Sequence, residues 1–216
     1  MTLRRVNLVV GAALVVQAAV VTVFLVGVVP VLLSVTADFG GGIPVASVNL
    51  GAATVVLLVF AALGRLVKPS PLARWIEWSQ VAGVTVFLAQ LNGVTDVAAL
   101  VALYALTAGA SLFLVLHERS APEAGRWPFS FGAAVAIVPW GVIAFYQVGG
   151  LLTGGDPGLV VRVLTVGLLL IASAYWYDMR LARVKDRARI AEIAHLVFVS
   201  ATVTILAWTS LALSAT

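Results

Sequence analysis

The chain contains no cysteine and few charged residues. Of its 216 residues, 10% are Asp, Glu, Lys or Arg and 62% are hydrophobic. A soluble domain carries about a quarter charged residues, so we expect lipid to be the solvent for most of this surface. Without cysteine there are no disulfides or thiolate metal sites. The two histidines, His117 and His195, are far apart in sequence, and no metal site is expected.

Charge of either sign is scarce, but the net charge is +4. A net positive charge can indicate nucleic-acid binding. Here the cations lie between apolar runs, which is the pattern of the positive-inside rule for membrane proteins. We therefore expect a lipid bilayer as partner, no nucleic acid, and a multi-pass protein of the plasma membrane.

Seven apolar runs predict an all-α bundle of seven transmembrane helices, in a single domain over residues 1–216. A spanning helix needs roughly 20 apolar residues. Barrel strands are about 10 residues long and alternate in polarity, unlike these runs. The expected spans are approximately 7–33, 45–67, 72–92, 96–117, 128–148, 158–179 and 192–213.

The cations are segregated between alternate connections. Of the 13 Lys and Arg residues, 12 fall on one side of the predicted membrane, and only Arg162 falls on the other. This predicts a cytoplasmic N-terminus and a C-terminus outside. The most basic connection is the loop 180–189, which is a topology signal in contact with anionic lipid or a docking site for a cytoplasmic partner. Its cations are Arg180, Arg183, Lys185, Arg187 and Arg189.

Glu77 is the most informative residue because it is an acid inside the third predicted span. Ionisable groups in spans usually face the bundle interior. Arg74 is three residues earlier and on the same helix face. The two residues form either an interfacial ion pair or an internal counter-ion site, and Glu77 is expected to pair with Arg74 or to be protonated.

Aromatic and small residues offer weaker signals. Pro139 removes a helix hydrogen bond and so bends the predicted helix. The segment Pro139-Trp140 at this bend either borders a cavity or only packs against neighbouring helices. Trp176 and Trp208 belong either to that cavity or to interfacial aromatic belts. Small residues at 107–111 favour close helix packing, with a homodimer face as the alternative. No nucleophile–base–acid set or phosphate loop is found, so no enzyme activity is expected.

Short motifs along nearly the whole chain resemble the heliorhodopsin family. They are LRRVNL at 3–8, RWIEWS at 74–79, VPW at 138–140 and LAW at 206–208. Their order and spacing together are more specific than any one of them. The resemblance implies a rhodopsin-like seven-helix fold with the N-terminus inside.

The resemblance also implies a retinal site, which this chain alters. The family holds retinal as a Schiff base on a seventh-helix lysine, with a third-helix glutamate as counter-ion. The glutamate corresponds to Glu77, followed by Ser79 of the same motif, but the lysine position falls on Val203. The only lysines are Lys68 and Lys185, near predicted span ends. Other polar positions of the family's pocket fall on Leu14, Arg65 and Val81.

These substitutions predict a relative without covalent retinal. The expected function is a receptor-like or interaction scaffold that binds a non-covalent retinoid or another apolar ligand. The residues expected around it are Glu77, Arg74, Ser79, Trp140, Trp176 and Val203. The alternative is an ion or small-solute transporter or channel with Glu77 in a polar pathway.

Overall fold

The computed structural model describes residues 3–66, 70–121, 123, 125–181 and 188–215. Within them the chain forms seven helices and one two-stranded antiparallel sheet. The helices are α1 (Leu3–Leu25), α2 (Leu50–Gly64), α3 (Pro71–Leu91), α4 (Val97–Arg119), α5 (Trp127–Thr153), α6 (Leu159–Leu181) and α7 (Ala188–Ser214); the strands are β1 (Leu32–Ala37) and β2 (Ile43–Asn49).

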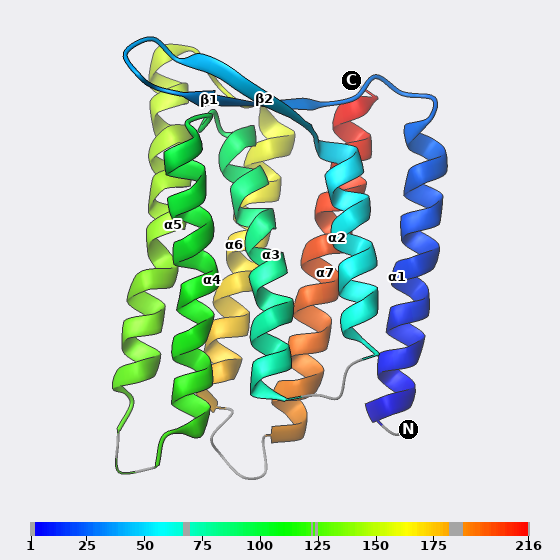
Figure 1. Ribbon diagram of the computed structural model, residues 1–216, viewed down its shortest axis with the longest axis vertical. Coiled ribbons are helices and arrows are strands. Elements are labelled where there is room, and N and C mark those ends of the chain that lie inside the picture. The colour runs from blue at the N-terminus through cyan, green and yellow to red at the C-terminus, as the bar shows by residue number, and fades with distance from the viewer. Residues whose placement is uncertain (1–2, 67–69, 122, 124, 182–187, 216) are drawn as a thin grey trace.

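The helices stand side by side in one bundle, and the chain termini lie at opposite ends of it (Figure 1). The buried interior is made of aliphatic side chains from several helices, including Leu14, Leu58, Leu88, Val203 and Leu206. Many large apolar side chains point outward instead. This is the distribution expected when lipid surrounds the bundle.

The connection between the first two helices differs from the prediction. α1 ends at Leu25, well before the predicted boundary at 33, and the predicted start of the second span at 45 lies in a strand. Gly27 and Pro30 follow α1, and proline disfavours helix at the residue before it. The β-branched stretch beyond then pairs as a hairpin, with Leu32 opposite Asn49. The hairpin lies across the C-terminal end of the bundle (Figure 1).

Five of the described helices are long and apolar enough to cross a membrane, namely α1, α4, α5, α6 and α7. α2 is apolar but has only 15 residues. α3 has 21 residues and carries Arg74 and Glu77 near its start. The described cations gather at the end of the bundle that holds the N-terminus, and Arg162 lies near the start of α6 at the other end. The charge segregation is therefore present in three dimensions.

The early end of α2 brings Arg65 into the bundle interior. Because α2 stops at Gly64, Arg65 lies in the interior as its C-terminal cap residue, with 6% of its surface exposed. Gly11 on α1 lets the two helices approach, since a Cβ added there would lie 3.1 Å from Arg65 Cβ. Arg65 is thereby held between α1 and α3.

Candidate functional site

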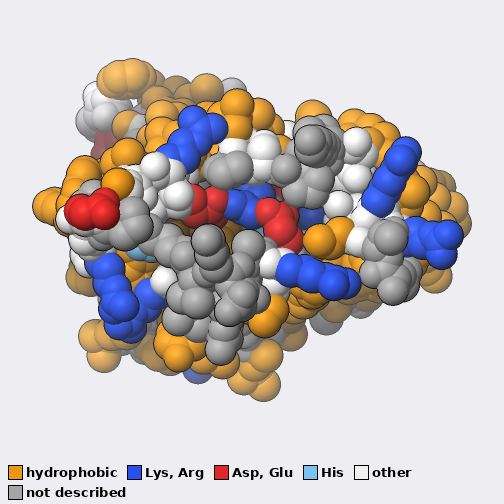
Figure 2. Space-filling model, turned by 90° about the horizontal axis from the view of Figure 1, so that it is seen from below, with side chains coloured by type: hydrophobic (Ala, Val, Ile, Leu, Met, Phe, Trp, Pro, Cys, Tyr) orange, Lys and Arg blue, Asp and Glu red, His pale blue; other side chains and the backbone are white. Residues whose placement is uncertain are grey.

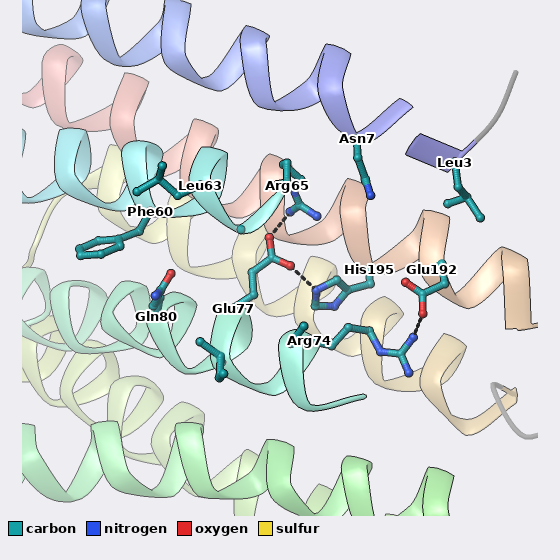
Figure 3. Close-up of a pocket in the computed structure, with 13 residues that line it drawn as sticks. Leu3, Asn7, Phe60, Leu63, Arg65, Arg74, Glu77, Gln80, Glu192 and His195 are labelled. Atoms are coloured by element: carbon teal, nitrogen blue, oxygen red, sulfur yellow. Dashed lines mark hydrogen bonds and ion pairs between the residues drawn. The ribbon is translucent and has the colours of Figure 1, made fainter. Parts of the chain in front are cut away.

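Glu77 lies at the centre of a buried polar cluster. α3 starts after Ser70, whose Oγ caps the helix by accepting from the Ala73 amide at 3.0 Å, and Glu77 follows two turns later. Its Oε1 lies 2.5 Å from Arg65 Nη2 and its Oε2 lies 2.7 Å from His195 Nε2 (Figure 3). Only 8% of Glu77 and 2% of His195 are exposed. The acid is thus held by α2 and α7.

A tyrosine orients the histidine ring. Tyr175 Oη lies 3.1 Å from His195 Nδ1, and the Tyr175 ring stacks on Trp78 with centroids 4.4 Å apart. If the Tyr175 hydroxyl donates to Nδ1, Nε2–H donates to the Glu77 carboxylate. The histidine thus links Tyr175 to Glu77 Oε2, and the guanidinium of Arg65 faces Glu77 Oε1.

Arg74 belongs to a separate ion-pair network. Its Nη2 contacts Glu118 of α4 and its Nη1 contacts Glu192 of α7. The expected pairing of Arg74 with Glu77 is therefore wrong, because Arg74 is turned toward α4 and α7. Residues three apart on one helix can be in contact. Here the guanidinium of Arg74 instead contacts carboxylates on the neighbouring helices α4 and α7.

The cluster borders a cavity of about 230 Å³ at the N-terminal end of the bundle. Acidic and basic side chains gather in a groove across the middle of this end (Figure 2). Its lining combines polar and apolar side chains. It is lined by Leu3, Asn7, Phe60, Leu63, Gly64, Arg65, Ala73, Arg74, Ile76, Glu77, Gln80, Glu192 and His195.

Two further cavities lie against Trp140 and Trp176. One, inside the bundle, is about 30 Å³ and is lined also by Trp78 and Thr202. That volume is about the share of one water molecule in the liquid. The other is about 260 Å³, lies between α5 and α6, and reaches the bundle surface at Ile137. Trp140 and Trp176 line both cavities and also pack against the aliphatic core.

The remaining predicted site residues do not join the Glu77 cluster. Ser79 Oγ donates to the Ile76 carbonyl of its own helix at 2.7 Å. Val203 is 1% exposed and belongs to the aliphatic core. It lies eight residues beyond His195, about 12 Å farther along α7. Lys68 and Lys185 lie outside the described residues, as does part of the basic loop 180–189.

The prediction missed Glu118, Tyr175, Glu192 and His195 as site residues. A signal existed on α7, where Glu192 and His195 are three residues apart and so share a face at the start of an apolar run. Arg65 was noted only as a changed position. Nothing in the sequence near Glu118 or Tyr175 separates them from ordinary interfacial residues.

The heliorhodopsin family model matches residues 3–213 of the chain. No curated protein matches it. The family match includes α1 to α6, all but the last residue of α7, and every residue of the Glu77 cluster. Because it extends over almost the whole sequence, this chain belongs to the heliorhodopsin family.

Proposed function

We propose that this heliorhodopsin-family membrane protein works without a covalently bound retinal, as a receptor-like or interaction scaffold. The observation that carries the proposal is Val203, a buried aliphatic residue at the position where the resemblance puts the family's lysine. A Schiff base needs a primary amine, and valine has none. Retinal therefore does not fit this position as a covalent group.

The surroundings of Glu77 support the same proposal. A counter-ion glutamate needs a nearby cation, which in a Schiff-base protein is the protonated imine. Here the guanidinium of Arg65 lies 2.5 Å from Glu77 Oε1. Arginine stays charged at any accessible pH, so Glu77 keeps its partner without a chromophore.

The cavities support non-covalent binding of an apolar ligand beside Trp140 and Trp176. The enclosed space of about 30 Å³ is far below the 300 Å³ or so at which ligand pockets begin. The cavity of about 260 Å³ between α5 and α6 approaches that size and is lined mostly by apolar side chains. An apolar ligand in the bilayer could reach it from the side.

The test is the absorption spectrum of the purified protein with and without all-trans-retinal. We expect no red-shifted band and no adduct after borohydride reduction. The control is a lysine-free variant, Lys68→Arg with Lys185→Arg, which keeps the charge. A reduced adduct in the unaltered protein defeats the proposal, and the control tells whether one of these lysines formed it.

Transport is the second candidate function. Its support is the chain of polar contacts from Tyr175 through His195 and Glu77 to Arg65, which borders a cavity at one end of the bundle. Buried ionisable groups often mark transport pathways. Flux of protons or small ions into liposomes that disappears in Glu77→Gln would favour transport over the scaffold.

A further inference from the structure

The polar groups at the N-terminal end of the bundle include more carboxylates than guanidiniums. The acids are Glu77, Glu118 and Glu192, and their described ion pairs with arginine involve only Arg65 and Arg74. Arg74 is shared, because Glu118 and Glu192 both contact it. Three carboxylates with two guanidiniums leave one negative charge in excess. Since all five side chains are at most 22% exposed, an uncompensated charge among them is costly.

His195 is placed where it can supply the missing positive charge. Its Nε2 lies 2.7 Å from Glu77 Oε2, and Glu192 is three residues earlier on the same helix, one turn away. Glu118 is close enough to His195 for their charges to interact. Histidine is the side chain that ordinarily gains or loses a proton near neutral pH. As an imidazolium, it would bring the count to three cations for three carboxylates.

The elements around this histidine bring no further buried guanidinium among the residues that the structure describes. α1 faces the cavity with the neutral side chain of Asn7, and α6 contributes the hydroxyl of Tyr175. Arg189 lies at the start of α7 but is exposed, where a surface charge contributes little. His117 of α4 packs instead against an aromatic ring of α5, with centroids 5.6 Å apart. The balancing charge therefore falls to His195.

Protonation of His195 reverses its hydrogen bond with Tyr175. The neutral ring can accept at Nδ1, which lies 3.1 Å from Tyr175 Oη, whereas an imidazolium donates from both nitrogens. The added proton takes the Nδ1 lone pair, and the Tyr175 O–H must then turn to another acceptor. A cavity of about 10 Å³ beside Tyr175 is also lined by Ser111 and Glu118. It is about the smallest cavity that holds a water, so an acceptor for that O–H fits there.

We propose that His195 binds a proton that balances the third carboxylate, and that this proton enters from the end of the bundle that holds the N-terminus. The cavity of about 230 Å³ at that end is lined by Glu77, Glu192 and His195 (Figure 3). Glu192 is the most exposed of the three acids, so water that enters the cavity brings protons to the cluster. Because His195 bonds α7 to α3 and α6, its charge affects how these helices are held together.

The test is NMR of the full chain in lipid nanodiscs, with isotope-labelled nitrogen in histidine only. The chain has two histidines, so His117→Gln assigns the two sets of ring signals. Between about pH 5 and 8, the His195 ring should show the two N–H groups of an imidazolium. A His195 ring that stays neutral throughout this range overturns the proposal.

Two variants test the charge balance. Glu118→Gln and Glu192→Gln each remove one carboxylate and leave the other to Arg74. At a pH where both forms of His195 are seen, the ratio of charged to neutral ring should fall about tenfold in each variant, because one nearby unit charge is lost. The control is Glu123→Gln, at an exposed position between α4 and α5, which should keep the ratio of the unaltered protein.

An unchanged ratio in either folded variant, or an equal fall in the control, overturns the proposal. If one variant does not fold, the other decides. The result is separate from the retinal test, since His195 and Val203 lie about 12 Å apart along α7. A retinal adduct would defeat the scaffold proposal and leave the proton site standing, whereas a neutral His195 would defeat only the proton site.

Discussion

At the scale of single residues, the cluster depends on the pairing of Arg65 with Glu77. Both side chains are buried, and removal of one member of a buried pair leaves an uncompensated charge. The cost is typically about 3–5 kcal/mol. Replacement of both members by apolar residues is often close to neutral. We therefore expect the pair to add little net stability and to specify how α2 meets α3.

Arg65→Met should lower the free energy of unfolding by about 3 kcal/mol or more, because Glu77 would keep only His195. The measurement is thermal or denaturant unfolding in detergent. Arg65→Met with Glu77→Met should recover most of the loss. Arg5→Met, at an exposed position of α1, is the control and should change little. A single variant as stable as the unaltered protein would show that the pair does not form.

A second residue-scale prediction concerns Asp156, in the connection before α6. Hydrogen bonds from Arg162 and from the Gly158 amide lower the pKa of this carboxyl below its ordinary 3.8. A lowered folded-state pKa adds stability above the ordinary value, and that stability is lost as the pH falls through the lowered pKa.

Asp156→Asn should therefore unfold slightly more easily than the unaltered protein at pH 6. Because Asp156 is exposed, the difference should be small. It should shrink further as the pH falls below 3.8. Melting curves of both proteins across this pH range provide the measurement, and a difference that grows toward low pH would contradict the assignment.

At the scale of elements, close helix contacts depend on glycine at particular positions. A Cβ added to Gly132 of α5 would lie 2.7 Å from Phe113 Cβ of α4 and 3.0 Å from Trp176 Cη2 of α6. Phe113 Cβ is fixed to the backbone and cannot rotate away. Gly109 of α4 has nothing within 4 Å of such a Cβ.

Gly132→Ala should destabilise the bundle by about 1–3 kcal/mol, the usual cost of overpacking, and should disturb the cavities lined by Trp176. Gly109→Ala is the matched control and should be neutral or slightly stabilising, since alanine favours helix by up to about 1 kcal/mol. Unfolding measurements on the two variants make the comparison. Equal stabilities would show that α4 and α5 are not packed this closely.

At the scale of the whole molecule, the bundle has two chemically different ends. Cations gather at the end with the N-terminus, and the hairpin covers the other (Figure 1). The positive-inside rule predicts that the cationic end faces the cytoplasm. The chain has no cysteine, so a single introduced cysteine can report on either end.

In intact cells, a membrane-impermeant maleimide should label Gly155→Cys, which lies at the end with Arg162, and should not label Arg126→Cys at the cationic end. Both positions are exposed. After permeabilisation both variants should be labelled, which controls for reactivity. Labelling of Arg126→Cys alone in intact cells would reverse the predicted orientation.

Composition and pattern were sufficient for the class of protein and for most of the helices. A soluble fold could not bury all the apolar surface of this chain. In lipid, backbone N–H and C=O groups must form their hydrogen bonds within helices or closed barrels. Residues such as Asp96 also mark boundaries locally, since its carboxylate caps α4 through the Ala99 amide. The hairpin was missed because its strands are apolar enough to resemble the ends of spans.

The partners of Glu77 were decided only by the tertiary structure. His195 is 118 residues away in sequence, and whether it or Arg74 meets Glu77 depends on how α3 and α7 are rotated against each other. Arg65 reaches the interior because α2 ends early and Gly11 leaves space. The sequence by itself determined that lipid surrounds the protein and that most of the chain is helical, through hydrophobicity and backbone hydrogen bonding. Side-chain pairing depended on packing between helices, which no local pattern records.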